Sequence, residues 1–160
     1  MAKGNRKVVR RRRPDVAHGE AVPRKILVAT DFSPVGNKAF TFASQLARKF
    51  GATLALIHVV PPVFQVEGLD AAGIAREGED WARKQVEQLR QQPEEIVIAH
   101  GDPVDTIVRE AKRQKADLLV LGSRGMSGLR GFMLGSVAQR VLQQAHCPVL
   151  VVPKLARVPK

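Results

Sequence analysis

The stretch from Asp117 to Val137 constrains the fold of this chain more than any other part. It begins with a run of four apolar residues, Leu118 to Leu121. Five glycines then fall within fourteen positions: Gly122, Gly125, Gly128, Gly131 and Gly135. Ser136 follows, and apolar residues at helical spacing come after it. We interpret this order as a buried strand, a glycine-rich loop and the beginning of a helix.

A loop of this kind suits a phosphate group. Glycine lets the backbone approach a ligand closely, and the beginning of a helix offers unpaired N–H groups with a partial positive charge. The loop is not a P-loop, because no lysine precedes Ser136, and it has no G-x-G-x-x-G fingerprint. A glycine-rich surface loop that binds nothing is the alternative at this point.

Apolar segments alternate with amphipathic segments along the rest of the chain. Strands are predicted over 25–30, 53–59, 95–99, 118–121 and 149–152, and helices over 34–50, 70–91, 104–115 and 136–145. Ser33 and Pro34 fit the beginning of the first helix, and Gly51 fits its end. Gly73 and Gly78 predict an irregular first half for the second helix, in which Trp81 is expected to be a packing anchor. The alternation predicts an α/β fold with a parallel sheet and helices on both faces.

The glycine spacing resembles one known family. The pattern G-x-x-G-(x9)-G-S is similar to that of the ATP-binding branch of the universal stress protein (UspA-like) family. Four further segments match that family in the same order: KILVATDFS at 25–33, HVV at 58–60, GDP at 101–103 and HCPVLVVP at 146–153. The resemblance covers residues 24–153. It implies a doubly wound, five-stranded, Rossmann-like sheet of the adenine nucleotide alpha hydrolase type, with strand order 3-2-1-4-5.

In that strand order the first and fourth strands are neighbours, and ligands bind at such a switch point. The resemblance implies a binding carboxylate at Asp31, although this side chain can also hold its own turn. It implies that the backbone of Val59, or of its neighbour Val60, contacts the adenine edge. The expected phosphate-binding residues are Gly122, Arg124, Gly125, Gly135, Ser136 and Val137. Arg124 and Arg130 fit either phosphate binding or a solvated loop.

ATP is therefore the expected cofactor, and it can carry Mg²⁺ on its phosphates. No dedicated metal site is expected, because His18, His58, His100 and His146 are scattered without ligand spacing. His58 and His100 are predicted to be structural, and His146 is a candidate for contact with a partner subunit.

Length and composition predict one domain in a chain of 160 residues, and the resemblance implies that it is a nucleotide-binding domain over 24–153. A single cysteine, Cys147, favours a reducing compartment, and no apolar run is long enough to cross a bilayer, so a cytoplasmic protein is expected. Residues 1–23 hold seven Lys or Arg and two acids, which predicts a disordered basic tail. A second basic tail is expected over 154–160. The first tail either contacts nucleic acid or an anionic surface, or is simply solvated.

Three functions are consistent with these features. The first is an ATP-binding regulatory module of the stress response, read by another protein. The second is a slow ATPase or other ATP-dependent enzyme, although no base beyond Asp31 is evident. The third is a nucleic-acid-associated dimer that uses the basic tail. A homodimer is expected through the apolar last strand, which consists of Val149, Leu150, Val151 and Val152.

Overall fold

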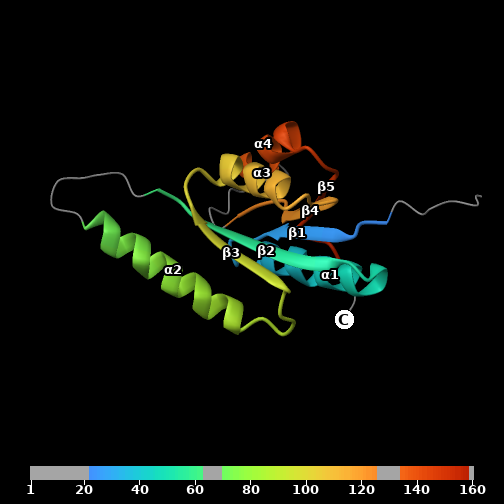
Figure 1. Cartoon of the computed structure of the whole chain (residues 1–160), viewed down its shortest axis with the longest axis horizontal. Helices are drawn as coiled ribbons and strands as arrows, with labels where there is room; N and C mark the ends of the chain where they lie inside the picture. The colour runs from blue at the N-terminus through green and yellow to red at the C-terminus, as the bar shows by residue number, and fades with distance from the viewer. Residues whose placement is uncertain (1–21, 63–69, 126–133, 159–160) are drawn as a thin grey trace, which may run out of the picture.

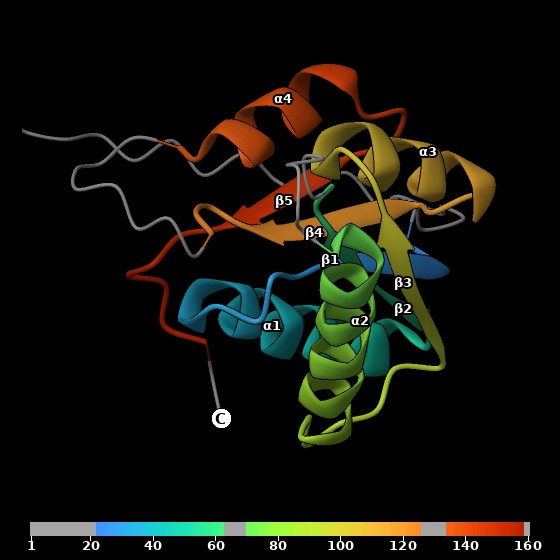
Figure 2. The ribbon, with the colours of Figure 1, turned by 90° about the vertical axis from the view of Figure 1, so that its left-hand side faces the viewer.

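The computed structural model describes residues 22–62, 70–125 and 134–158 (Figure 1). Within these residues it shows one sheet covered by helices on both faces (Figures 1 and 2). The basic tail before Val22, the loop residues Gly128, Arg130 and Gly131, and the end of the C-terminal tail lie outside the described residues.

The sheet has the predicted strand order, β3-β2-β1-β4-β5, with every pair of neighbours parallel. Its strands are β1 (Lys25–Ala29), β2 (Thr53–Val60), β3 (Glu95–His100), β4 (Leu118–Gly122) and β5 (Val149–Val152). The central strands are buried on both faces, as their continuous apolar sequences predict. The doubly wound α/β prediction is therefore confirmed.

Four helices form the two outer layers. They are α1 (Pro34–Phe50), α2 (Ala71–Glu87), α3 (Pro103–Arg113) and α4 (Ser136–Gln144). Because side chains alternate along a strand, Ile26 and Val28 of β1 pack on the side of α1 and α2. Leu27 and Ala29 pack on the other side, against α3 and α4.

Capping residues fix where the helices begin and end. The Ser33 hydroxyl accepts a hydrogen bond from the backbone N–H of Gly36 at 3.1 Å, with Pro34 in the first turn. Gly51 ends α1 with a φ of 65°, a left-handed conformation that favours glycine. These three predictions from the sequence are confirmed.

The prediction of an irregular first half for α2 was wrong. The helix is continuous from Ala71, because Asp70 accepts a hydrogen bond from the Gly73 N–H at 2.9 Å. A Cβ at Gly78 would lie 3.0 Å from Cγ1 of Val60. Gly78 therefore allows α2 to approach β2 closely. The helix ends at Glu87, four residues before its predicted end.

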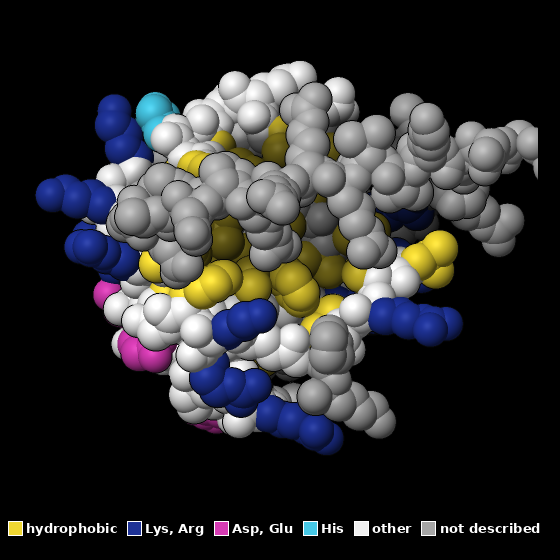
Figure 3. Space-filling model, turned by 90° about the vertical axis from the view of Figure 1, so that its right-hand side faces the viewer, with side chains coloured by type: hydrophobic (Ala, Val, Ile, Leu, Met, Phe, Trp, Pro, Cys, Tyr) yellow, Lys and Arg dark blue, Asp and Glu magenta, His cyan; other side chains and the backbone are white. Residues whose placement is uncertain are grey.

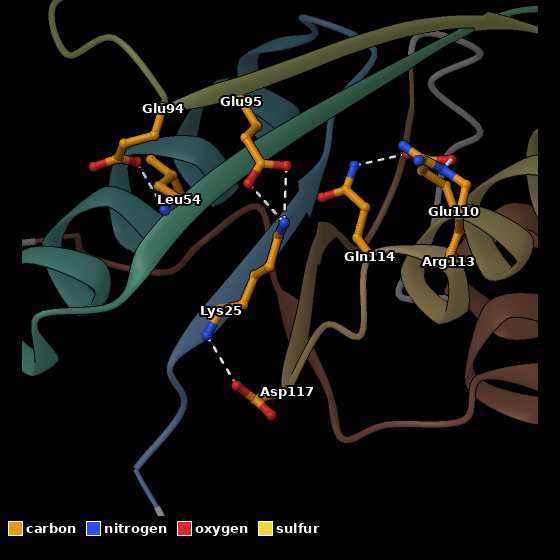
Figure 4. Close-up of polar contacts among 8 residues, drawn as sticks. All are labelled: Lys25, Leu54, Glu94, Glu95, Glu110, Arg113, Gln114 and Asp117. Carbon is orange, nitrogen blue, oxygen red and sulfur yellow. Dashed lines mark hydrogen bonds and ion pairs between the residues drawn. The ribbon is translucent and has the colours of Figure 1, made fainter.

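Polar contacts tie neighbouring strands together at the edge of the sheet where the strands begin (Figure 4). The Lys25 ammonium contacts both Glu95 oxygens at 2.7 and 2.8 Å, which links β1 to β3 across β2. The backbone N–H groups of Arg24 and Lys25 both donate to Asp117 at 2.9 Å. We call this edge, formed by the strand N-termini and the C-terminal ends of α1 and α3, the N-terminal edge. Among the described helices, none is both long enough and apolar enough to cross a membrane.

Candidate functional site

A cavity of about 390 Å³ opens at the opposite edge, where the strands end. Its walls come from the ends of β1, β2 and β4, from α2, and from the beginnings of α3 and α4. All eight residues that the sequence singled out line it: Asp31, Val59, Gly122, Arg124, Gly125, Gly135, Ser136 and Val137. The topology thus brings together segments that are far apart in the sequence.

Asp31 directly follows β1 and lies between two glycines. Its Oδ1 accepts a hydrogen bond from the Ser33 N–H at 3.0 Å, so it holds its own turn. A Cβ at Gly36 would lie 2.7 Å from Oδ1, and a Cβ at Gly125 would lie 2.7 Å from Oδ2. The carboxylate is therefore enclosed between the beginning of α1 and the loop after β4. It both supports the turn and lines the cavity.

Gly122 and Gly135 bring the first turns of two helices close to the loop after β4. A Cβ at Gly122 would lie 3.1 Å from Cγ1 of Val35 and 3.2 Å from the backbone nitrogen of Gly36. The Gly135 N–H donates to the Ser123 carbonyl at 2.8 Å, and a Cβ there would lie 3.2 Å from the same oxygen. A side chain at either position would thus crowd the protein's own backbone and side chains, in addition to any ligand.

The beginning of α4 differs from those of the other three helices. Side chains of Ser33, Asp70 and Asp102 cap α1, α2 and α3, whereas α4 begins after Gly135 without a side-chain cap. Ser136 and Val137, the first residues of α4, line the cavity and are exposed. First-turn N–H groups have no partner within their own helix. The cavity therefore has an N-terminal helix end whose chemistry suits an anion.

An aromatic cluster forms another wall of the cavity, and sequence reasoning did not place it there. The ring of Phe32 lies 5.0 Å from that of His58 and 5.6 Å from that of Trp81, with the Trp81 contact edge-to-face. His58 and Trp81 line the cavity. Trp81 packs against Phe32 and His58, in keeping with the predicted packing anchor, and at 40% exposure it is also a partly open wall of the cavity. Phe32 adopts a left-handed φ of 58°, which is strained for a residue other than glycine.

His58 is buried and serves the structural role that the sequence predicted. Its Nδ1 lies 2.9 Å from the Thr30 carbonyl, across β1 and β2, which favours the neutral tautomer with the proton on Nδ1. Burial lowers the pKa of His58 below its ordinary value of 6.5, although the Thr30 carbonyl and the nearby Asp31 charge oppose that shift.

The lowered pKa predicts a pH-dependent stability. Because folding holds His58 neutral, its contribution is complete above pH 6.5 and declines as the pH falls through the lower pKa of the folded state. Urea unfolding at pH 7.5 and 5.5 is expected to show a smaller stability loss for His58→Gln than for the wild type, because glutamine can donate to Thr30 without titrating. An equal loss in both proteins would exclude His58 as the source.

His100, at the end of β3, contacts Glu79 of α2. The hydrogen bond from His100 lowers the pKa of Glu79. This contact joins α2 to the edge of the sheet and supports the structural role predicted for His100. Within the described ranges, no group of three or more His, Cys, Asp or Glu side chains has the arrangement of a metal site.

Comparisons with known proteins agree with this architecture. A model of the Universal stress protein family matches residues 23–153. A universal stress protein of Methanocaldococcus jannaschii is 37% identical over 150 residues, covering 87% of each chain. Universal stress protein YxiE of Bacillus subtilis is 36% identical over 152 residues, covering 80% of this chain and 97% of its own.

Solved structures show the same relationship. Universal stress protein UspA from Lactobacillus plantarum superposes with a TM-score of 0.72 at 27% identity, covering 80% of this chain and 96% of its own. A universal stress protein solved in complex with cAMP has a TM-score of 0.56 at 31% identity, covering 82% of this chain and 97% of its own. The chain is thus a doubly wound α/β protein with a cavity at the switch point of its sheet. It belongs to the universal stress protein family.

Proposed function

We propose that this protein binds ATP in the cavity at the strand C-termini and acts as a nucleotide-dependent regulatory module of the stress response. One observation carries the proposal: the eight residues predicted from sequence line a single cavity onto which the uncapped beginning of α4 opens. Glycines at 122, 125 and 135 keep the surrounding backbone close together. Such a site offers N–H donors and little steric bulk to a phosphate chain.

In this proposal the two ends of the cavity hold the two ends of the nucleotide. The backbone of Val59 would contact the adenine edge, beside the aromatic wall formed by His58 and Trp81. Ser136 and Val137 would donate N–H groups to the β- and γ-phosphates, with Arg124 as a further donor of positive charge. Any Mg²⁺ would be bound through the phosphates and not by a dedicated set of protein ligands.

The cAMP complex of a family member at 31% identity supports an adenine nucleotide as the ligand class. We favour ATP over a cyclic monophosphate here, because Gly122, Gly125 and Gly135 line the same cavity as the uncapped first turn of α4, which offers N–H donors to more than one phosphate. A regulatory role is favoured over efficient catalysis, because Asp31 accepts a hydrogen bond from the Ser33 N–H and leaves no room for a Cβ at Gly125. A slow ATPase is the alternative that a turnover assay would distinguish.

Pairing of two copies through β5 is part of the same proposal. This strand lies at the edge of the sheet, and its residues 149–151 are only partly buried. Two nearby apolar side chains, Leu142 on α4 and Leu155 after β5, are 44% and 81% exposed. An apolar, unpaired edge favours association, and a cytoplasmic dimer is the form that we expect in the cell.

Mass spectrometry of nucleotide released from the purified, undialysed protein tests the proposed ligand. We expect ATP or ADP in the released fraction, and a rise in melting temperature on addition of millimolar ATP with Mg²⁺. cAMP is the matched comparison, and we expect a smaller rise with it. A folded protein that releases no nucleotide and gains no thermal stability from ATP would contradict the proposal.

A further inference from the structure

Basic residues gather at the N-terminal edge, away from the cavity. The last turn of α1 carries Arg48 and Lys49, and α3 ends with Lys112 and Arg113, followed by Lys115. The two helices lie on opposite faces of the sheet, so this edge is basic on both sides (Figures 1 and 2). Many Lys and Arg side chains project around the face seen in Figure 3, whereas few Asp or Glu side chains are visible there.

Four acids beside these cations are already bound within the protein. Glu95 pairs with Lys25, and Glu110 pairs with Arg113 at 2.6 Å (Figure 4). Asp117 accepts the N–H groups of Arg24 and Lys25, and Glu94 accepts the N–H of Leu54 at 2.7 Å.

Four exposed cations at this edge have no such partner. Among the described residues, no acid forms an ion pair with Arg48, Lys49, Lys112 or Lys115. Each side chain keeps its charge facing solvent. We call these four residues the basic edge.

The N-terminal part of the sequence joins the fold at the same place. The chain enters β1 at Lys25, and the preceding residues 1–23 add seven Lys or Arg and only two acids. The basic N-terminal sequence therefore comes directly before the point where the chain enters the fold at this edge. Together they account for much of the formal net charge of +11.

We propose that the basic edge binds the phosphate backbone of duplex nucleic acid, independently of base sequence and of the nucleotide cavity. Duplex DNA carries one negative charge per ~1.7 Å of its axis, which makes it a strong partner for clustered cations. Sequence readout is not expected, since no aromatic residue occurs in residues 1–23 and helix N-termini do not lie at this edge.

An anionic membrane is a less suitable partner for the same surface. Stable membrane association needs apolar insertion in addition to charge. Near this edge the described large apolar side chains with notable exposure are Val22, Phe50 and Ile96, at 38%, 39% and 47%. Each is more than half covered by the protein, so three separate side chains offer little area for insertion.

Fluorescence anisotropy with a labelled 30-base-pair DNA duplex of arbitrary sequence tests this inference, with the full chain titrated from 50 to 200 mM NaCl. The edge variant carries Arg48→Gln, Lys49→Gln, Lys112→Gln and Lys115→Asn. Asparagine suits position 115, whose φ is 53°. The control variant removes the same charge elsewhere, through Arg76→Gln, Arg140→Gln, Lys154→Gln and Arg157→Gln.

We expect the edge variant to bind at least ~10-fold more weakly at 50 mM NaCl. The slope of log affinity against log salt is expected to fall in magnitude by about 3.6, because each of the four lost phosphate contacts accounts for about 0.9 of it. The control should stay within about threefold of the wild type. Equal losses in both variants would show that net charge alone acts and would overturn the proposal. Binding to phosphatidylserine vesicles without duplex binding, or no duplex binding by the wild type at 50 mM NaCl, would overturn it as well.

Discussion

Replacing Ser136 with Asp is expected to weaken ATP binding by about 100-fold without weakening the fold. Position 136 is the first residue of α4 and lines the cavity, so a carboxylate there would face the proposed phosphates. Two unit charges 4 Å apart repel by about 4 kcal/mol at an effective dielectric constant of ~20, and solvent screens part of this. The remaining ~2.7 kcal/mol corresponds to a 100-fold change in Kd. Isothermal titration calorimetry with ATP and Mg²⁺ measures this change in Kd.

Ser136→Asn is the matched control, because Asn has the size of Asp without its charge. We expect the Asn variant to bind ATP within about tenfold of the wild type. The Asp variant should melt no lower than the wild type, since a negative charge near a helix N-terminus is stabilising. If the Asp variant binds ATP within threefold of the wild type, the phosphates do not lie at the beginning of α4.

Replacing Val151 with Pro is expected to convert the proposed dimer to a monomer. Every second residue of β5 directs its backbone N–H and C=O groups toward β4. The Pro148 carbonyl accepts from the Leu119 N–H at 3.0 Å, and the Val152 carbonyl accepts from the Ser123 N–H at 2.9 Å. The residues between them in this alternation, Val149 and Val151, direct their backbone groups to the open edge. Proline at 151 removes an outward N–H and leaves the contacts with β4 in place.

Sedimentation at micromolar concentration measures the result, for which we expect a dimer Kd raised at least ~100-fold. Val151→Thr keeps the N–H and is the control that should remain dimeric. Circular dichroism verifies that both variants retain the wild-type fold. A Val151→Pro protein that is still a dimer would place the interface elsewhere, and a wild type that is only monomeric would exclude the dimer.

The sequence predicted the strands within one residue of their observed ends, because each strand is a short apolar run with clear turn residues around it. The strand order needed the family resemblance, since alternation alone leaves several topologies. The eight predicted residues lie together because five of them lie at the C-terminal ends of β1, β2 or β4 or just after them, and three lie at the beginning of α4. Their positions depend on the backbone topology. Their role in nucleotide binding stays a prediction.

The aromatic wall could not be predicted in the same way. His58 is one strand position before Val59, and Trp81 is one of many exposed residues of a polar helix, so neither pattern indicates a shared cavity. Their contact depends on how closely α2 approaches β2, which Gly78 permits. Glycine has a low helix propensity, which disfavours Gly78 inside a helix, but the packing of α2 against β2 overrides that preference.

Helix α2 buries few residues against the sheet, and this affects how a ligand can enter and leave the cavity. Only Ala82 and Val86 of this helix are fully buried, whereas α1 buries seven residues. A segment with so few buried apolar contacts forms a separate cooperative unit that opens at lower free energy than the whole domain. Its amide hydrogens should exchange with solvent well before those of β1. The wall that carries Trp81 is therefore expected to open and close while the sheet stays folded.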